Sequence, residues 1–192
     1  MEHGHTQEGK PRRLYGPANG LENLTIYELG MTFMALERFL ETKDDDYALE
    51  LLAILYRPKK PHTRENALSA YQGDRRLPLL HHEATIPARK KLMAKLPDLV
   101  RAFLIFWFAC CRQQIIRQFP NIFHQPEPNA AGERVGNDYA WGGILLNLAD
   151  GIIHLDAVAS QPWSNALTYL SMLEDRRKEM EMELAKQKQK IR

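Results

Sequence analysis

Few residues of this 192-residue chain combine types and spacing that would support chemistry. His81, His82 and Glu83 are consecutive, so they cannot all point at one metal, and zinc sites need four ligands at defined spacings. His3 and His5 lie on a polar N-terminus, where a third-position imidazole captures copper or nickel adventitiously. We therefore predict no metal site.

The only two cysteines, Cys110 and Cys111, are adjacent. Neighbouring residues form a strained disulfide, so two free thiols in a reducing compartment are the better interpretation. They end the apolar run 102–111, and we expect both to be buried rather than nucleophilic. Because no acid/base pair or nucleophile–base pair is visible, we predict a protein that is not an enzyme and has no cofactor.

Basic residues cluster between residues 57 and 91, which is the one feature suggesting nucleic-acid binding. The formal net charge is only +2, no aromatic residues are interleaved for base stacking, and no DNA-binding motif accompanies the cluster. We interpret this basic loop as solvated and keep a nucleic-acid-binding regulator as a second alternative function. Its residues are Arg57, Lys59, Lys60, Arg75, Arg76, Arg89, Lys90 and Lys91.

Apolar residues at helical spacing predict an all-α fold, an irregular bundle of about six helices with long loops. Thr25 and Glu28 have the spacing of a capping box at the start of the first helix. Asp44–Asp46 favour the start of a second helix. That helix must end near Tyr56, because Pro58 disfavours helical geometry in the residue before it. The short connection makes the pair an antiparallel hairpin.

Two more helices are predicted at residues 87–95 and 98–119, and another begins at Asp138. The run AFLIFWFACC (102–111) is too short for a membrane span of about 20 residues, so we expect it to be buried all round in a soluble core. The N-terminus has no apolar run typical of a secretory signal, and we expect a cytoplasmic protein.

Composition divides the chain into three parts. Residues 1–20 contain four Gly and two Pro without apolar periodicity, which predicts a flexible arm. Residues 21–174 form the helical domain, with a candidate module boundary in the Pro- and Gly-rich segment 120–137. Ser160 is the expected N-cap of the last helix. Residues 175–192 continue that helix as a charged tail that projects from the body, either as a solvated helix or as a helix that binds a partner.

Two stretches resemble known proteins. GLENLTIYELGMTFMALERFLETKDDDYALELLAILYRPKK, together with LPDLVRAFLIFWFACCRQQIIRQFPNIF, is similar to small proteins encoded in tail-gene clusters of Bacteroidetes phages and prophages. DYAWGGILLNLADGIIHLDAVASQPWSNALTYLSMLEDRR resembles the end module of phage tail assembly chaperones. In that module a helix with a Trp-Gly start, a short D-x-V turn and an amphipathic helix recur.

The resemblance implies a non-enzymatic assembly chaperone or accessory protein that binds a tape-measure-like tail subunit of a phage-like particle. The alternative is a structural head–tail connector or baseplate component, which would remain in the mature particle. The implied partner is a protein in the host cytoplasm, a homo-oligomer is left open, and neither nucleic acid nor a membrane is expected. We expect the client-contacting residues to be Trp141, Trp163, Tyr169, Met180, Met182 and Leu184.

Overall fold

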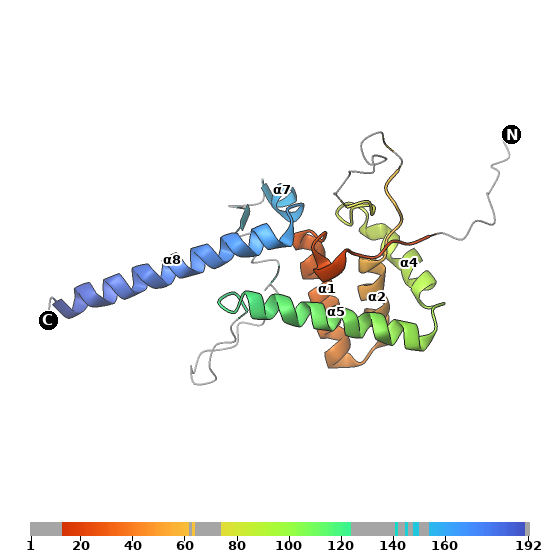
Figure 1. Ribbon diagram of the computed structural model, residues 1–192, viewed down its shortest axis with the longest axis horizontal. Coiled ribbons are helices and arrows are strands. Elements are labelled where there is room, and N and C mark those ends of the chain that lie inside the picture. The colour runs from red at the N-terminus through yellow and green to blue at the C-terminus, as the bar shows by residue number, and fades with distance from the viewer. Residues whose placement is uncertain are drawn as a thin grey trace.

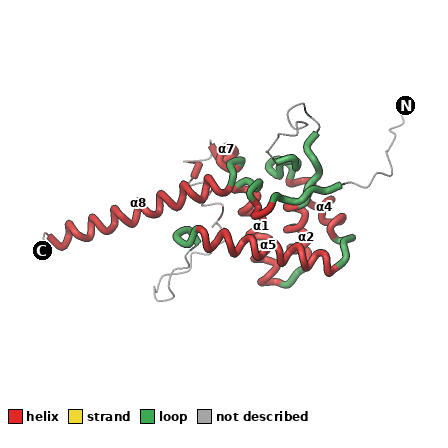
Figure 2. Tube along the Cα trace, viewed as in Figure 1, coloured by secondary structure: helices red, strands yellow, loops and turns green. Residues whose placement is uncertain are grey.

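The computed structural model describes residues 13–61, 63, 74–123, 141, 145, 148–149 and 154–190. Within these residues the protein is all-α, with six α-helices and no strand, so the predicted fold class is confirmed. Figure 1 shows a body of crossing helices from which the C-terminal helix projects. Figure 2 shows loops at several places on the body, while the projecting part is helix alone.

The first two helices form the predicted hairpin, α1 (Ile26–Thr42) and α2 (Asp45–Leu55). The capping box is confirmed: the Glu28 backbone N–H donates to Thr25 Oγ1 at 3.2 Å, and the Glu28 carboxylate accepts from the Thr25 backbone N–H. α1 ends at Lys43, whose φ of 58° is left-handed. α2 ends at Tyr56, ahead of Pro58, as expected.

The core lies where α1 and α2 meet aromatic residues from later in the chain. The Phe33 ring packs edge-to-face against Trp141, with centroids 5.2 Å apart, and against Phe108 at 6.3 Å. A Cβ added to Gly30 would lie 3.0 Å from the Trp141 indole. The Trp141 ring therefore packs directly against the α1 backbone at Gly30, where a side chain would crowd it. Trp141 is helical, as are the other described residues of its segment: Leu145, Leu148 and Ala149.

The helix expected at the centre of the core is largely exposed instead. α4 (Ile86–Met93) leads into α5 (Asp98–Gln118), which crosses the α1–α2 hairpin (Figure 1). The side chains of Leu99, Phe103 and Phe106 are 83, 65 and 67% exposed. The prediction that the first half of this helix is buried all round was wrong. The hairpin covers one face of α5, and no described element covers the opposite face near its N-terminus.

Because the hairpin covers only one face of α5, the two adjacent cysteines differ in exposure. Cys111 is buried against the hairpin, whereas Cys110 is exposed, so the expectation that both are buried was wrong for Cys110. Consecutive helical residues point about 100° apart, and α5 has only one covered face. Burial, and to a lesser extent the neighbouring Cys110 thiol, raises the pKa of Cys111.

We expect two clearly separated rates when the native protein reacts with a thiol-specific reagent at pH 8. Cys110 should react fast and Cys111 at least about tenfold more slowly, because the thiolate is the nucleophile and the Cys111 pKa is raised. Mass spectrometry after peptide digestion measures both rates. Cys110→Ser should remove the fast phase alone, and equal rates in the native protein would contradict the placement of Cys111.

The chain ends in α7 (Leu155–Ala159) and α8 (Trp163–Lys190). Ser160 follows α7, and its hydroxyl donates to the Asp156 carbonyl at 2.8 Å. It is therefore not the N-cap of α8, because Gln161 and Pro162 lie between them. With 28 residues at 1.5 Å each, α8 is about 42 Å long, and its C-terminal part projects as predicted.

Two predicted parts fall partly outside the described residues. Of the arm at 1–20, residues 1–12 lie outside them, and Tyr15 exchanges two backbone hydrogen bonds with Arg57, at 2.8 and 3.1 Å. Of the module boundary at 120–137, residues 124–137 lie outside them. The division into arm, domain and tail stays a prediction.

Candidate functional site

Three residues of the expected solvated basic loop are buried. Arg57 and Arg76 are each only 1% exposed, and they meet the buried carboxylate of Glu28 beside the start of α1. Both Arg57 Nη atoms donate to Glu28, with Nη2 2.9 Å from Oε2. Asp74 completes the cluster, with its Oδ2 2.9 Å from Arg76 Nη2 and 3.4 Å from Arg57 Nη2. Two acids and two bases therefore balance within the ion cluster of Glu28, Arg57, Asp74 and Arg76.

The ion cluster also holds the surrounding backbone in place. Arg76 donates to the carbonyls of Leu55 at 2.9 Å and Asn23 at 3.3 Å, and Arg57 donates to the carbonyl of Leu77 at 3.0 Å. The backbone N–H of Leu79 donates to Glu28 Oε1 at 3.2 Å. These bonds join the end of α2, the segment 74–79 and the start of α1. The arrangement is a structural clamp and not a cationic surface.

Arg89 is buried in a second place. Its Nε donates to the Ala53 carbonyl at 2.6 Å, and it contacts Thr85, which fixes α4 against α2. Burial lowers the pKa of both Arg57 and Arg89. Of the other predicted basic-loop residues, Lys90 pairs with Asp46 and Lys60 is half-buried. Lys59 and Arg75 are exposed on two segments that the Lys60 N–H joins by donating to the Arg75 carbonyl at 2.8 Å, and Lys91 is exposed on α4. The structure thus contradicts a convergent, solvated patch of all eight residues.

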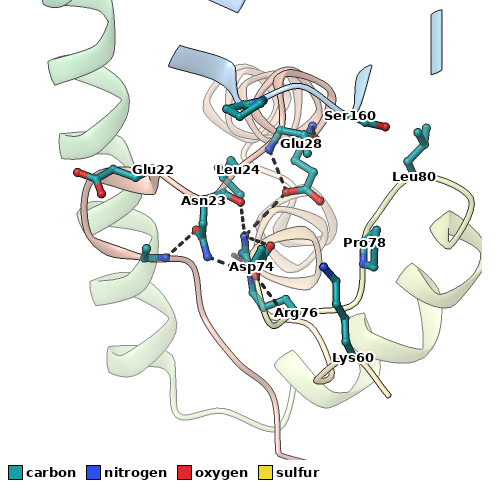
Figure 3. Close-up of a pocket in the computed structure, with 13 residues that line it drawn as sticks. Glu22, Asn23, Leu24, Glu28, Lys60, Asp74, Arg76, Pro78, Leu80 and Ser160 are labelled. Carbon is teal, nitrogen blue, oxygen red and sulfur yellow. Dashed lines mark hydrogen bonds and ion pairs between the residues drawn. The ribbon is translucent and has the colours of Figure 1, made fainter. Parts of the chain in front are cut away.

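A pocket of about 580 Å³ opens beside the ion cluster (Figure 3). Glu28, Asp74 and Arg76 form part of its wall, with Lys60 and Leu80 from the loops. Glu28 and Asp74 each pair with Arg76, so the charges of these three residues are already neutralised within the fold. No His or Cys side chain is among the residues that line this pocket. In the parts of the chain that the structure describes, no three His, Cys, Asp or Glu side chains are arranged to hold a metal ion.

The residues predicted to contact a client divide into two groups. Trp141 and Trp163 are buried in the core, so they do not offer a surface to a partner. The Trp163 indole donates to the Leu21 carbonyl at 2.8 Å. The remaining four are exposed along α8: Tyr169, Met180, Met182 and Leu184. The helical spacing of Trp163 with Ala166, Leu167 and Leu170 was the signal that this tryptophan belongs to the buried side of α8.

An apolar groove between α5 and the α1–α2 hairpin was missed by the sequence reasoning. Its volume is about 570 Å³. It continues onto the exposed side of α5 at Phe106. Its charged lining residues are Asp45, Asp98 and Arg101, and Arg101 pairs with Asp98. The sequence signal for this groove was that residues 102–111 are apolar on all sides. Because one hairpin covers only one side of a helix, part of that apolar surface must stay exposed. The lining residues of this α5 groove are Leu36, Phe39, Leu40, Asp45, Ala48, Leu49, Leu52, Asp98, Arg101, Ala102, Ile105, Phe106 and Ala109.

Among the described residues, α5 is also long and apolar enough to cross a membrane, judged by length and composition, and 17% of its most apolar window is buried. The core helix of a soluble protein can meet the same criteria when it is mostly buried, whereas α5 is not. The exposed apolar face of α5 therefore needs an explanation other than the chain's own core. No protein family, curated protein or solved structure matches this chain.

Proposed function

We propose that this chain is a non-enzymatic assembly factor that holds an apolar segment of a tape-measure-like subunit of a phage-like tail. The observation that carries the binding role is the apolar surface of α8, where Met180, Met182 and Leu184 are 59, 57 and 56% exposed. Large apolar side chains gathered on an exposed element mark interaction sites. Methionine adapts to irregular partners, which suits a surface that holds a client temporarily.

The geometry of α8 favours a partner over the chain's own body. Residues four apart lie on one face of a helix, so Met180 and Leu184 share a face, while Met182 points about 200° away from Met180. The tail therefore offers apolar contacts on two sides. Arg177 forms ion pairs with Glu174 and with Glu181, and both of these partners belong to α8 itself. The tail is thus free to be enclosed by another protein.

The identity of the partner is supported by the resemblance of the segment from Asp138 to Arg177 to tail assembly chaperones. In such an arrangement the helical body positions α8, and α8 shields apolar helices of the client until the client polymerises. Asn121, which follows α5, attaches α8 to the body: its Nδ2 donates to Ser171 Oγ at 2.8 Å and to Asp175 Oδ1 at 3.2 Å.

Affinity capture from the native host tests the proposal. We expect tagged full-length protein to capture a tail subunit, identified by mass spectrometry, and a chain ending at Asp175 to lose it. This truncation keeps the Asn121 contacts and removes the exposed apolar tail, so the shortened chain should have an unchanged circular dichroism unfolding midpoint.

Equal capture by both proteins would move the contact to the helical body. Capture of nucleic acid that salt releases, with no tail subunit, would overturn the proposal. Purified mature particles decide between the chaperone and the connector or baseplate alternative, because a chaperone is absent from them.

A further inference from the structure

The α5 groove has an acidic end. Residues 37–50, which run from the end of α1 through the connection into α2, contain six acidic and two basic residues. Glu37 pairs with Arg112 and Asp46 with Lys90, while Glu41 and Asp45 lie exposed beside the apolar groove residue Leu40. An occupant that suits this surface has apolar side chains for the groove and positive charge for its acidic end.

The end of α8 combines apolar side chains with positive charge, the two features that this groove requires. Met180 and Leu184 share one face, and Lys188 lies one turn further along that face. Residues 184–190 contain three lysines and no acidic residue. The α8 tail therefore presents two exposed apolar side chains followed by positive charge, which complements the apolar groove followed by its acidic end.

The tail of the same molecule does not reach the groove. α8 leads away from the body, whereas the groove lies between α5 and the α1–α2 hairpin (Figure 1). α8 is one continuous helix from Trp163 to Lys190, and it contains no Gly or Pro at which it would break. Docking within one chain would need a reversal that this sequence disfavours, so the complementary tail must come from a second copy.

We propose that the α8 tail of one copy docks in the α5 groove of a second copy. Met180 and Leu184 contact the apolar side chains of Ile105 and Phe106, and Lys188 faces Glu41 and Asp45. Reciprocal docking gives a two-fold dimer, and one-way docking gives an open chain of copies. This inference goes beyond the proposed function: self-docking covers the apolar surfaces, and a client must compete for them.

Sedimentation equilibrium of the full-length protein, repeated with single variants, tests the docking. We expect concentration-dependent association that Leu184→Glu and Phe106→Glu each weaken about tenfold or more, the scale of losing one buried apolar side chain. Met182→Glu is the matched control, because Met182 has nearly the same exposure as Leu184 but points to another side of α8. It should leave association unchanged.

A mixture of the two weakened variants separates tail-in-groove docking from other contacts. Leu184→Glu retains an intact groove and Phe106→Glu an intact tail, so together they should form a species with the mass of two chains, at concentrations where each alone is a monomer. Pairing of α5 with α5, or of tail with tail, predicts no such recovery.

Several results would overturn the inference. These are a monomer at all concentrations, equal effects of Leu184→Glu and Met182→Glu, or failure of the mixture to recover. A further result would assign the α5 face to lipid: monomeric protein that binds phosphatidylcholine–phosphatidylserine vesicles and loses this binding in Phe106→Glu. Because sedimentation uses purified protein alone, failure here leaves the capture of a tail subunit as a separate result.

Discussion

Replacing Glu28 with glutamine is expected to lower the free energy of unfolding by about 3–5 kcal/mol, the cost of breaking a buried ion pair from one side. Glu28 lies between two guanidinium groups that are almost fully buried, and the substitution leaves Asp74 alone to balance both. Glutamine still serves at this position of a capping box. The loss therefore reports the missing charge and not a missing helix cap. Urea unfolding followed by circular dichroism measures it.

Glu22→Gln is the matched control, because Glu22 is an exposed carboxylate close to the same helix start. Its effect should stay within about 0.5 kcal/mol, as for most surface substitutions. Adding Arg57→Met to Glu28→Gln should recover part of the stability, since the second change removes the uncompensated charge. A loss below about 1 kcal/mol in Glu28→Gln would mean that water enters and solvates the ion cluster.

The capping box shows how far local patterns reach. The spacing of Thr25 and Glu28 correctly predicted the start of α1, because both partners lie within one helical turn. The second role of Glu28 depends on Arg57 and Arg76, which follow it by 29 and 48 residues in sequence. No periodicity links such distant residues. From the sequence, the charges of Arg57 and Arg76 therefore suggested a solvated basic loop, whereas in the structure the two side chains form a buried clamp with Glu28.

The error over α5 has a different physical origin. A helix that is apolar on all sides indicates burial only if enough other elements surround it. Helix bounds could be predicted from local signals, but the number of neighbours available to cover α5 depends on tertiary packing. The hairpin covers the side that contains Phe108 and Cys111, and leaves Phe103, Phe106 and Cys110 exposed. A second candidate interaction surface, besides the apolar surface of α8, therefore lies on the helix that the sequence predicted to be core.

Trp163→Ala is the second substitution with a large expected effect, a loss of about 3–5 kcal/mol in the free energy of unfolding. The Trp163 ring is buried and packs edge-to-face against Phe119, with centroids 6.3 Å apart. Its indole N–H also holds the carbonyl of Leu21, a buried residue whose φ of 65° is costly for a leucine. The tryptophan thus fixes the base of α8 to the segment that precedes α1.

Two further variants separate this structural role from a surface role. Trp163→Phe keeps an aromatic ring but removes one of two hydrogen bonds to the Leu21 carbonyl, which still accepts from the Leu24 backbone N–H at 3.0 Å. It should therefore cost about 0.5–1.5 kcal/mol for the lost hydrogen bond, plus some lost packing. Tyr169→Ala, on the exposed side of the same helix, should stay within about 0.5 kcal/mol in unfolding but weaken capture of the tail subunit. If Trp163→Ala instead unfolded like the unaltered protein and lost only partner capture, Trp163 would belong to the client surface. The start of α8 would then be held to the body without the indole, by the Asn121 contacts and by the Trp163 backbone N–H, which donates to the Leu24 carbonyl at 3.2 Å.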